Sequence, residues 1–141
     1  MNQALRKFLM CFTQFFYTDS AIDLVELLNF RTAPAGIEQT TGFCANREGG
    51  TTDAAFRVSS RSVASVPTAQ IFPAGFPEDF SILATFKAKP QSKSILLSAY
   101  SAAGVEVLSL KIGRRLKLTY QGEKATAKRR LKFGAQLADG E

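Results

Sequence analysis

Residues 79–120 read DFSILATFKAKPQSKSILLSAYSAAGVEVLSLKIGRRLKLTY, and this stretch decides the fold class. Apolar residues occupy every second position in much of it, as they do when one face of a β-strand is buried. Short polar or glycine-containing segments separate the runs, which is typical of hairpin turns. The predicted strands are Asp79–Lys87, Ser94–Tyr100, Val105–Ile112 and Arg114–Tyr120. No strand–helix alternation appears, so the sequence predicts an antiparallel rather than a parallel sheet.

The stretch before residue 79 extends this prediction with less regular elements. Ile22–Phe30 has the apolar spacing of a short amphipathic helix, which Asp19 or Ser20 could cap. The segment 31–53 is rich in turn residues. Two shorter strands are predicted at Ala55–Val58 and Gln70–Phe72. The sequence therefore predicts an all-β fold, an antiparallel β-sandwich with a short N-terminal helix.

Composition limits the function. The chain has 141 residues, which suits one domain, and it contains no histidine and two cysteines, Cys11 and Cys44. Serine–histidine and cysteine–histidine nucleophilic sites are therefore excluded, as are zinc sites built on imidazole or on four thiolates. The acidic residues are scattered and no pair indicates a shared cleft. We therefore expect a protein that is not an enzyme and needs no cofactor or metal.

Residues 1–20, MNQALRKFLMCFTQFFYTDS, resemble a secretory signal peptide. Arg6 and Lys7 precede about ten mainly apolar residues, a run too short to span a bilayer, which needs ~20 residues. Two alternatives stay open: an amphipathic first helix, and a start that is not native to the domain. We expect a leader at 1–20 and a folded domain at 21–141.

The basic residues are concentrated in one part of the chain. Nine of the 18 lie between Lys111 and Lys132, where Glu123 is the single acid. Two similar runs carry them, RRLKL from residue 114 and KRRLKF from residue 128. In strands, Arg115 would share a face with Lys117, and residues 130 and 132 would do the same. A hairpin through 121–127 would unite the two runs into one patch.

Such a patch is typical of a polyanion-binding site, because guanidinium and ammonium groups bind sulfates and carboxylates. The candidate residues are Arg114, Arg115, Lys117, Lys128, Arg129, Arg130 and Lys132. One alternative is a solvated basic face that blocks edge-to-edge pairing of strands. Another is a nucleic-acid site, which is less favoured because Tyr120 is the only aromatic residue interleaved with the basic ones.

The remaining candidates have structural explanations. Five acids could be considered as calcium ligands, but they lack a loop with ligands at alternate positions, and we expect them to cap helices and form turns. They are Asp19, Asp23, Asp53, Glu78 and Asp79. Four phenylalanines are expected in the core rather than in a ligand pocket. They are Phe72, Phe76, Phe80 and Phe86.

Several short segments, in this order and spacing, carry a resemblance to a known family. They are Thr40-Thr41-Gly42-Phe43-Cys44, Ala55-Phe56-Arg57-Val58, Pro67-Thr68, Phe72-Pro73, Gly75-Phe76-Pro77-Glu78-Asp79-Phe80-Ser81-Ile82-Leu83, Ser98-Ala99-Tyr100, Gly104-Val105 and Leu137-Ala138-Asp139-Gly140. Together they resemble the N-terminal laminin-G-like, thrombospondin-type domain of fibrillar collagen chains of the type V/XI group. The resemblance runs from about residue 22 to the end of the chain.

The resemblance implies a laminin-G or concanavalin-like jelly roll of which this chain holds roughly the first two-thirds. In the family, the Asp-Gly pair is followed by a further strand and the rest of the sandwich. Later cysteines of the family would pair with the position of Cys44, so we expect this thiol to lack its disulfide partner here. An incomplete sandwich also leaves apolar faces and strand edges without neighbours.

The resemblance further implies a secreted, non-enzymatic module of the extracellular matrix. It would lie at the N-terminus of a collagen-type chain, influence fibril assembly, and bind heparan sulfate or heparin-like glycans through the basic patch. Collagen chains and other matrix proteins are the implied protein partners, and neither a membrane nor a nucleic acid is expected. The alternative function is that of a basic β-sheet protein that binds nucleic acid through residues 111–132.

Overall fold

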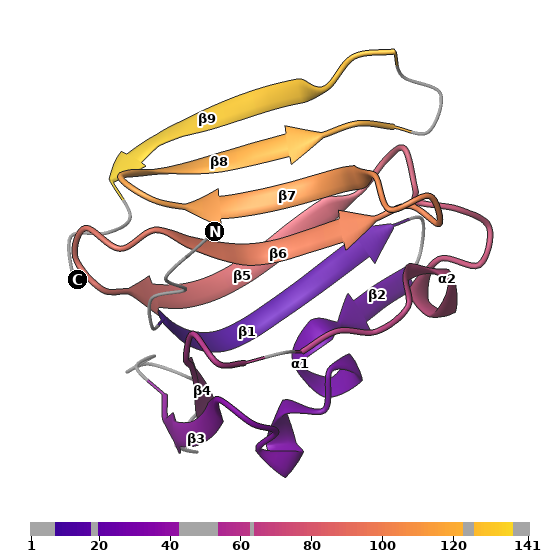
Figure 1. Ribbon diagram of the computed structural model, residues 1–141. Helices are drawn as coiled ribbons and strands as arrows, with labels where there is room; N and C mark the ends of the chain where they lie inside the picture. Colours follow the sequence, from indigo (N-terminus) through magenta and orange to yellow (C-terminus); the bar gives the residue numbers. More distant parts are fainter. Residues whose placement is uncertain (1–7, 18–19, 43–53, 63, 123–125, 137–141) are drawn as a thin grey trace. The chain divides into compact units, whose positions relative to one another are not determined.

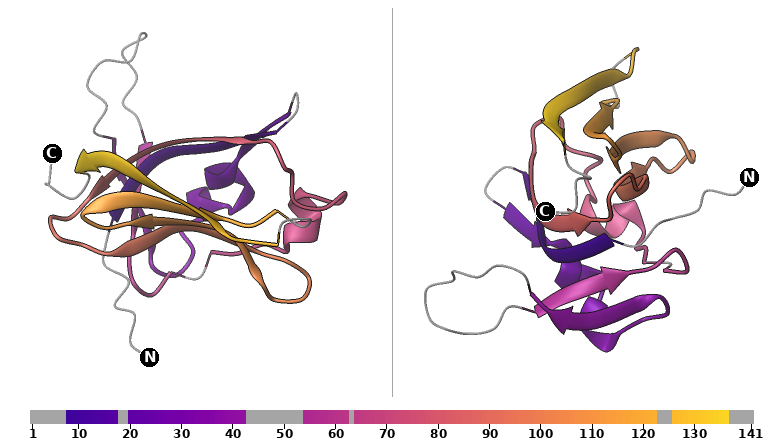
Figure 2. Two further views of the ribbon diagram at one scale, coloured as in Figure 1. Left: turned by 90° about the horizontal axis from the view of Figure 1, so that it is seen from above. Right: turned by 90° about the vertical axis from the view of Figure 1, so that its left-hand side faces the viewer.

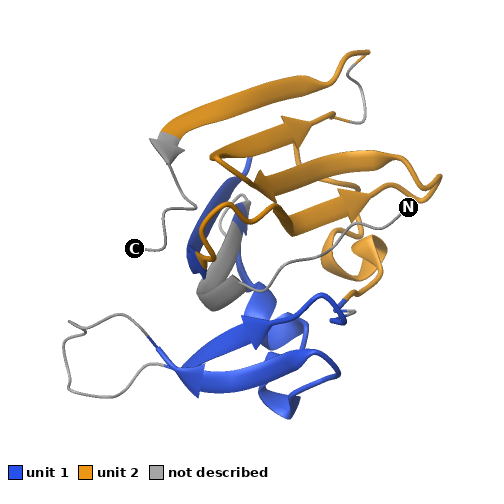
Figure 3. Cartoon of the chain, turned by 60° about the vertical axis from the view of Figure 1, so that its left-hand side comes forward, with its two compact units in different colours: residues 1–64, 80–87 blue, residues 65–79, 88–141 orange. Residues whose placement is uncertain are grey.

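The chain is mostly β-strand and divides into two compact units. The computed structural model describes residues 8–17, 20–42, 54–62, 64–122 and 126–136, with backbone alone at 8–15, 17, 135 and 136. Unit 1 comprises residues 1–64 and 80–87, and unit 2 comprises 65–79 and 88–141, so the chain passes between them more than once (Figure 3). The predicted all-β, antiparallel class is confirmed. The sandwich and jelly-roll arrangement stays a prediction.

Unit 1 is built on a five-stranded sheet (Figure 1). Its strands are β1 (Phe8–Tyr17), β2 (Ser20–Asp23), β3 (Ile37–Thr41), β4 (Ala54–Val58) and β5 (Ser81–Ala88). They follow the order β2-β1-β4-β3, and β5 also pairs with β1. The pairs β1–β2, β1–β4 and β3–β4 are antiparallel. Aromatic and β-branched residues favour β1, β4 and β5, since their side chains pack well on a pleated surface.

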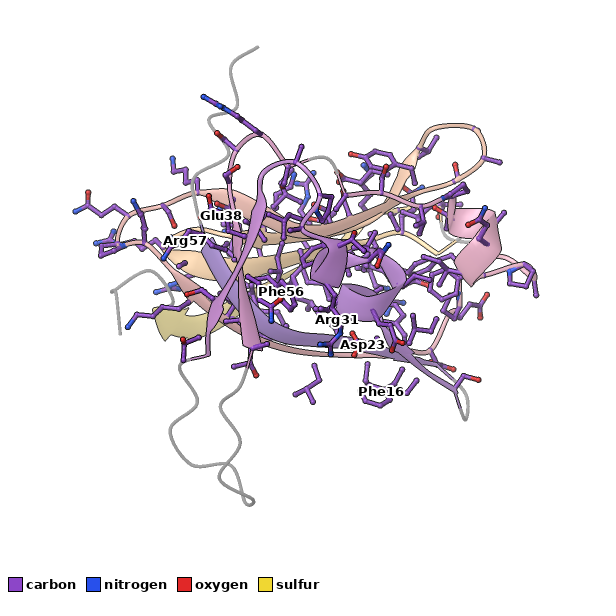
Figure 4. All side chains as sticks on the ribbon, turned by 90° about the horizontal axis from the view of Figure 1, so that it is seen from below. Phe16, Asp23, Arg31, Glu38, Phe56 and Arg57 are labelled. Atoms are coloured by element: carbon purple, nitrogen blue, oxygen red, sulfur yellow. The ribbon has the colours of Figure 1, made fainter. Side chains whose placement is uncertain are left out.

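The register of β3 against β4 places Glu38 directly opposite Arg57. Their side chains form an ion pair of 3.6 Å, and they lie beside one another in Figure 4. Both are more than half exposed, so we expect the pair to contribute little to stability. Other residues form the core of the unit, chiefly Phe56, which is 2% exposed. The ring of Phe56 packs edge to face against the ring of Phe30, with 5.7 Å between their centroids.

The helix predicted at Ile22–Phe30 is wrong in its extent. Residues up to Asp23 extend strand β2, and the helix α1 (Leu24–Leu27) is a single turn. Asp23 is its N-cap, in place of the predicted Asp19 or Ser20, and its Oδ1 accepts hydrogen bonds from the amides of Val25 at 2.9 Å and Glu26 at 3.2 Å. Asn29 adopts a left-handed conformation, with φ of 55°, which ends the helix because a right-handed turn cannot continue through it.

The turn-rich segment 31–53 holds more regular structure than predicted. A 3-10 turn, η1 (Phe30–Thr32), precedes strand β3, and both belong to unit 1. Strand β3 alternates poorly, since only Ile37 is buried and polar residues follow it. Its pairing with β4 compensates for this weak pattern. Cys44, whose disulfide partner was predicted to be absent, lies outside the described residues.

The apolar run near the N-terminus forms strand β1. It pairs with β2 through Gln14–Tyr17 and with β4 through Phe8–Met10. The amphipathic helix considered as an alternative is therefore wrong for these residues, and the leader at 1–20 stays a prediction. Among the described residues, none of the helices has the length and apolar character needed to cross a bilayer.

Unit 2 contains a four-stranded antiparallel sheet with the order β6-β7-β8-β9 (Figure 1). Its strands are β6 (Ser94–Tyr100), β7 (Glu106–Ile112), β8 (Arg115–Tyr120) and β9 (Arg129–Gln136). Each strand pairs with the next along the chain, and the further views show the twist usual for such sheets (Figure 2). The strands predicted at 94–100, 105–112 and 114–120 are confirmed within one residue at each end.

Burial in this sheet is greatest on β7. Leu108, Leu110 and Ile112 are buried as predicted, but Val107 and Ser109 on the opposite face are buried as well. Strand β7 is thus covered on both faces over much of its length, although alternation predicted one solvated face. On β9, the last strand in the order of this sheet, every described side chain is exposed.

The strand predicted at Gln70–Phe72 is wrong, because Thr68–Ile71 forms the one-turn helix α2. Four residues are too few to show helical periodicity in the sequence. Phe72 is buried, as predicted, and meets Phe76 edge to face at 5.0 Å. Phe76 in turn lies 6.0 Å from the ring of Tyr120, whose hydroxyl donates to the carbonyl of Pro77 at 3.2 Å. These contacts attach the segment 65–79 to the sheet of unit 2.

Candidate polyanion-binding site

The two basic runs form neighbouring strands of one sheet. Gly113 ends β7, and the chain returns as β8 with the first run; the second run forms β9. Strands β8 and β9 are antiparallel, with Lys117 opposite Lys132 and Thr119 opposite Arg130. The two runs are therefore neighbours in one sheet, which is the condition under which we expected them to form one patch.

A row of three lysines crosses the sheet on one face. Lys111 of β7 is opposite Lys117, which is opposite Lys132. Residues directly opposite each other in an antiparallel pair share a face, with Cβ atoms about 4.5–5.5 Å apart. All three side chains are exposed. We call Lys111, Lys117 and Lys132 the lysine row.

Two arginines extend the positive charge of this face along the strands. Arg130 lies two residues from Lys132, on the same face, and is exposed. Arg115 lies two residues from Lys117 and is also exposed, with a register shift against β9 between them. The neighbouring cross-strand row on the same face consists of Ser109, Thr119 and Arg130. Ser109 on β7 is buried, Thr119 on β8 is half-buried, and Arg130 on β9 is exposed. The basic face is thus open at the lysine row and toward the β9 edge.

The structure does not bring the seven predicted residues to one face. Arg129 is opposite Tyr120 and belongs to the face that carries Leu118 and Leu131. Arg114 lies in the turn between β7 and β8, and Lys128 precedes β9, so strand pairing fixes neither on the basic face. Arg115, Lys117, Arg130 and Lys132 are the predicted residues that do gather there.

Lys111 was missed as a site residue, although the sequence carried its signal. The alternation that buries Leu108, Leu110 and Ile112 places Lys111 on the other face of β7. What the sequence could not supply was the register that sets it beside Lys117. The lysine row thus depends on strand pairing rather than on a local motif.

The electrostatic arrangement of the row is unfavourable for the isolated fold. Strands β8 and β9 contain no acidic residue. Like charges directly opposite each other in a sheet are destabilising. The lysine row contains two such pairs, Lys111–Lys117 and Lys117–Lys132. A bound polyanion would neutralise both, which makes this face a candidate binding site.

The acidic residues that the structure describes show no grouping suited to a cation. No cluster of three histidine, cysteine, aspartate or glutamate side chains occurs in the part of the chain that the structure describes. Asp23 caps α1, which confirms the predicted capping role for this residue. Glu78 and Asp79 are exposed in the segment before β5, and Asp19 and Asp53 lie outside the described residues.

No protein-family model matches the sequence, and no solved structure gives a significant match.

Proposed function

We propose that this chain is a non-enzymatic β-module that binds sulfated glycosaminoglycans across the lysine row. The main support for this proposal is the cross-strand register that aligns the exposed side chains of Lys111, Lys117 and Lys132. Strands β8 and β9 contain no acidic residue that could neutralise these three cations. Neighbouring strands lie about 4.8 Å apart, so the ammonium groups form a closely spaced series that a densely charged polymer can neutralise. Arg115 and Arg130 add guanidinium groups, which bind sulfate through paired hydrogen bonds.

A sulfated glycan suits this face better than a nucleic acid. Binding of single strands relies on aromatic side chains on which bases stack. Tyr120 is the aromatic residue of β8 and is paired with Arg129. It lies three residues from Lys117, so alternation places its side chain on the face opposite the lysine row. Its hydroxyl donates to Pro77, and its ring contacts Phe76. Tyr120 is therefore held on the other face of the sheet, and the lysine row offers charge without a stacking surface.

The setting of this binding, in our proposal, is the extracellular matrix. The module would be secreted and would lie at the N-terminus of a collagen-type chain, where it influences fibril assembly and contacts other matrix proteins. The support is the resemblance of residues 22–140 to the laminin-G-like domain of type V/XI collagen chains, together with the leader-like residues 1–20. Secretion of the full chain by cultured cells tests the location, and the N-terminal sequence of the secreted product shows whether residues 1–20 are removed.

Heparin affinity tests the binding site. We expect the triple variant Lys111→Ala, Lys117→Ala, Lys132→Ala to bind heparin about tenfold more weakly, because exposed ion pairs contribute roughly 0.5 kcal/mol each and 1.4 kcal/mol is tenfold. The matched control replaces three other exposed lysines, Lys87, Lys89 and Lys93, with alanine. Both triple variants then have the same formal net charge. The measurement is the dissociation constant, supported by the salt concentration that elutes each variant from a heparin column.

Equal losses in both triple variants would refute a specific site, since net charge alone would then govern binding. Desulfated heparin should bind weakly if sulfate is the recognised group. Tight binding of a structured RNA, without a preference for heparin, would favour the nucleic-acid alternative.

A further inference from the structure

Among the strands that the structure describes, β9 lies at an edge of its sheet. It is the last strand in the order β6-β7-β8-β9, and no described strand pairs with its outer edge. The backbone N–H and C=O groups of such an edge are available to another extended chain. Main-chain hydrogen bonds to an added strand are a common mode of peptide recognition, in which alternate side chains give specificity.

The side chains of β9 present two different surfaces to an added strand. Leu131 is 56% exposed and Phe133 is 43% exposed, and alternation places them on one face. Leu131 continues a cross-strand row, Leu110–Leu118–Leu131, in which Leu110 is buried and Leu118 half-buried. A further apolar side chain beyond Leu131 would extend this row and cover it.

The opposite face of β9 carries charge of one sign. Arg130 and Lys132 lie there, Arg129 is on the apolar face, and the strand has no acidic residue. A second copy of this chain would bring the same cations against them, so pairing of β9 with itself is disfavoured. An added strand with acidic residues opposite Arg130 and Lys132 would gain opposite-charge pairs instead. Charge complementarity therefore selects an acidic partner.

We infer that the free edge of β9 binds an extended peptide in which acidic and apolar residues alternate. The peptide adds a fifth strand to this sheet, with its apolar side chains beside Leu131 and Phe133 and its carboxylates beside Arg130 and Lys132. This inference goes beyond glycan binding, because it uses the backbone edge and the apolar face of β9, which a glycan on the lysine row does not need.

The test uses the full chain and a synthetic, end-blocked peptide with four alternating Glu-Val pairs. We expect saturable binding and slower amide hydrogen exchange at the outward-facing N–H groups of β9. A peptide of the same composition with four Glu followed by four Val keeps the charge but cannot match both faces, and it should bind about tenfold more weakly. Equal binding of the two peptides would overturn the inference, since charge alone would then suffice.

Variants of the protein separate this site from the lysine row. Leu131→Ser should weaken the alternating peptide but leave heparin binding unchanged. Its matched control is Leu83→Ser on β5, since Leu83 is 52% exposed and should leave the peptide affinity unchanged. Lys111→Ala should weaken heparin and spare the peptide. Loss of peptide binding in Leu83→Ser to the same degree, or association of the chain with itself through β9, would overturn the proposed partner.

Discussion

At the scale of single residues, Lys117 is the position where stability and binding conflict. It lies between Lys111 and Lys132, so Lys117→Glu converts two like-charge pairs into two opposite-charge pairs. We expect this variant to be more stable by about 1 kcal/mol, because each cross-strand charge pair contributes roughly 0.2–1 kcal/mol. Its heparin affinity should fall, since an anion would then stand in the middle of the row.

Chemical denaturation and heparin titration of Lys117→Glu measure the two effects. Lys117→Gln is the intermediate control, which removes the repulsion without adding attraction. A loss of stability in Lys117→Glu would contradict the like-charge interpretation of the row.

Gly36 and Gly104 provide a matched test of backbone constraint. Both have positive φ, 81° and 76°, in the region that disfavours residues with a Cβ. A Cβ at Gly36 would lie 2.5 Å from the amide nitrogen of Ser62, whereas a Cβ at Gly104 would meet nothing within 4 Å. We expect Gly104→Ala to lower the free energy of unfolding by about 1–2 kcal/mol and Gly36→Ala by clearly more. Thermal denaturation followed by circular dichroism compares them, and equal losses would contradict the close backbone approach at Gly36.

At the scale of elements, α1 depends on its cap because it is a single turn. Asp23 accepts two amide hydrogen bonds, from Val25 and Glu26. Asp23→Ala should lower stability by about 1 kcal/mol, the usual effect of losing an N-cap, whereas Asp23→Asn should retain most of it. Denaturant unfolding of the two variants decides this, and identical losses in both would show that charge rather than capping is responsible.

Elements with a strong alternating pattern were predictable from the sequence, and elements fixed by tertiary pairing were not. Strands β5, β6, β7 and β8 agree with their predicted ranges within about two residues. The predicted helix over 22–30 failed because the segment Ser20–Asp23 pairs with β1, an interaction between chain segments that local apolar spacing does not reveal. Strand β3 was missed for the same reason, since its pairing with β4 compensates for its polar sequence.

The candidate site shows the same division. The shared face of Arg130 and Lys132 followed from period-two alternation, whereas the pairing of the two basic runs was only considered as the arrangement that would unite them. Alternation alone also places Arg129 on the face opposite Arg130 and Lys132. The inclusion of Lys111 required the observed register, because a shift of one residue moves a strand's side chains to the other face. A sequence alone does not contain that register.

At the scale of the whole molecule, charge is separated along the chain. Residues 111–132 hold nine basic residues and one acid, a net charge of +8, so the remainder of the chain carries −2. Much of the attraction to a polyanion should therefore arise in this segment of unit 2. Binding of a polyanion releases the counterions condensed on it, so the logarithm of the binding constant falls linearly with the logarithm of salt concentration.

The slope of that line counts ionic contacts, which makes it a test of where the glycan binds. If three lysines of the row each contact an anionic group, their replacement by alanine should reduce the slope by about 2–3, as each contact contributes somewhat less than one. Replacing Lys87, Lys89 and Lys93 changes the net charge equally and should leave the slope almost unchanged, because these residues lie outside the 111–132 segment. Heparin titrations at several sodium chloride concentrations give both slopes. A similar decrease for the two triple variants would mean that binding responds to total charge and that the lysine row has no special part in it.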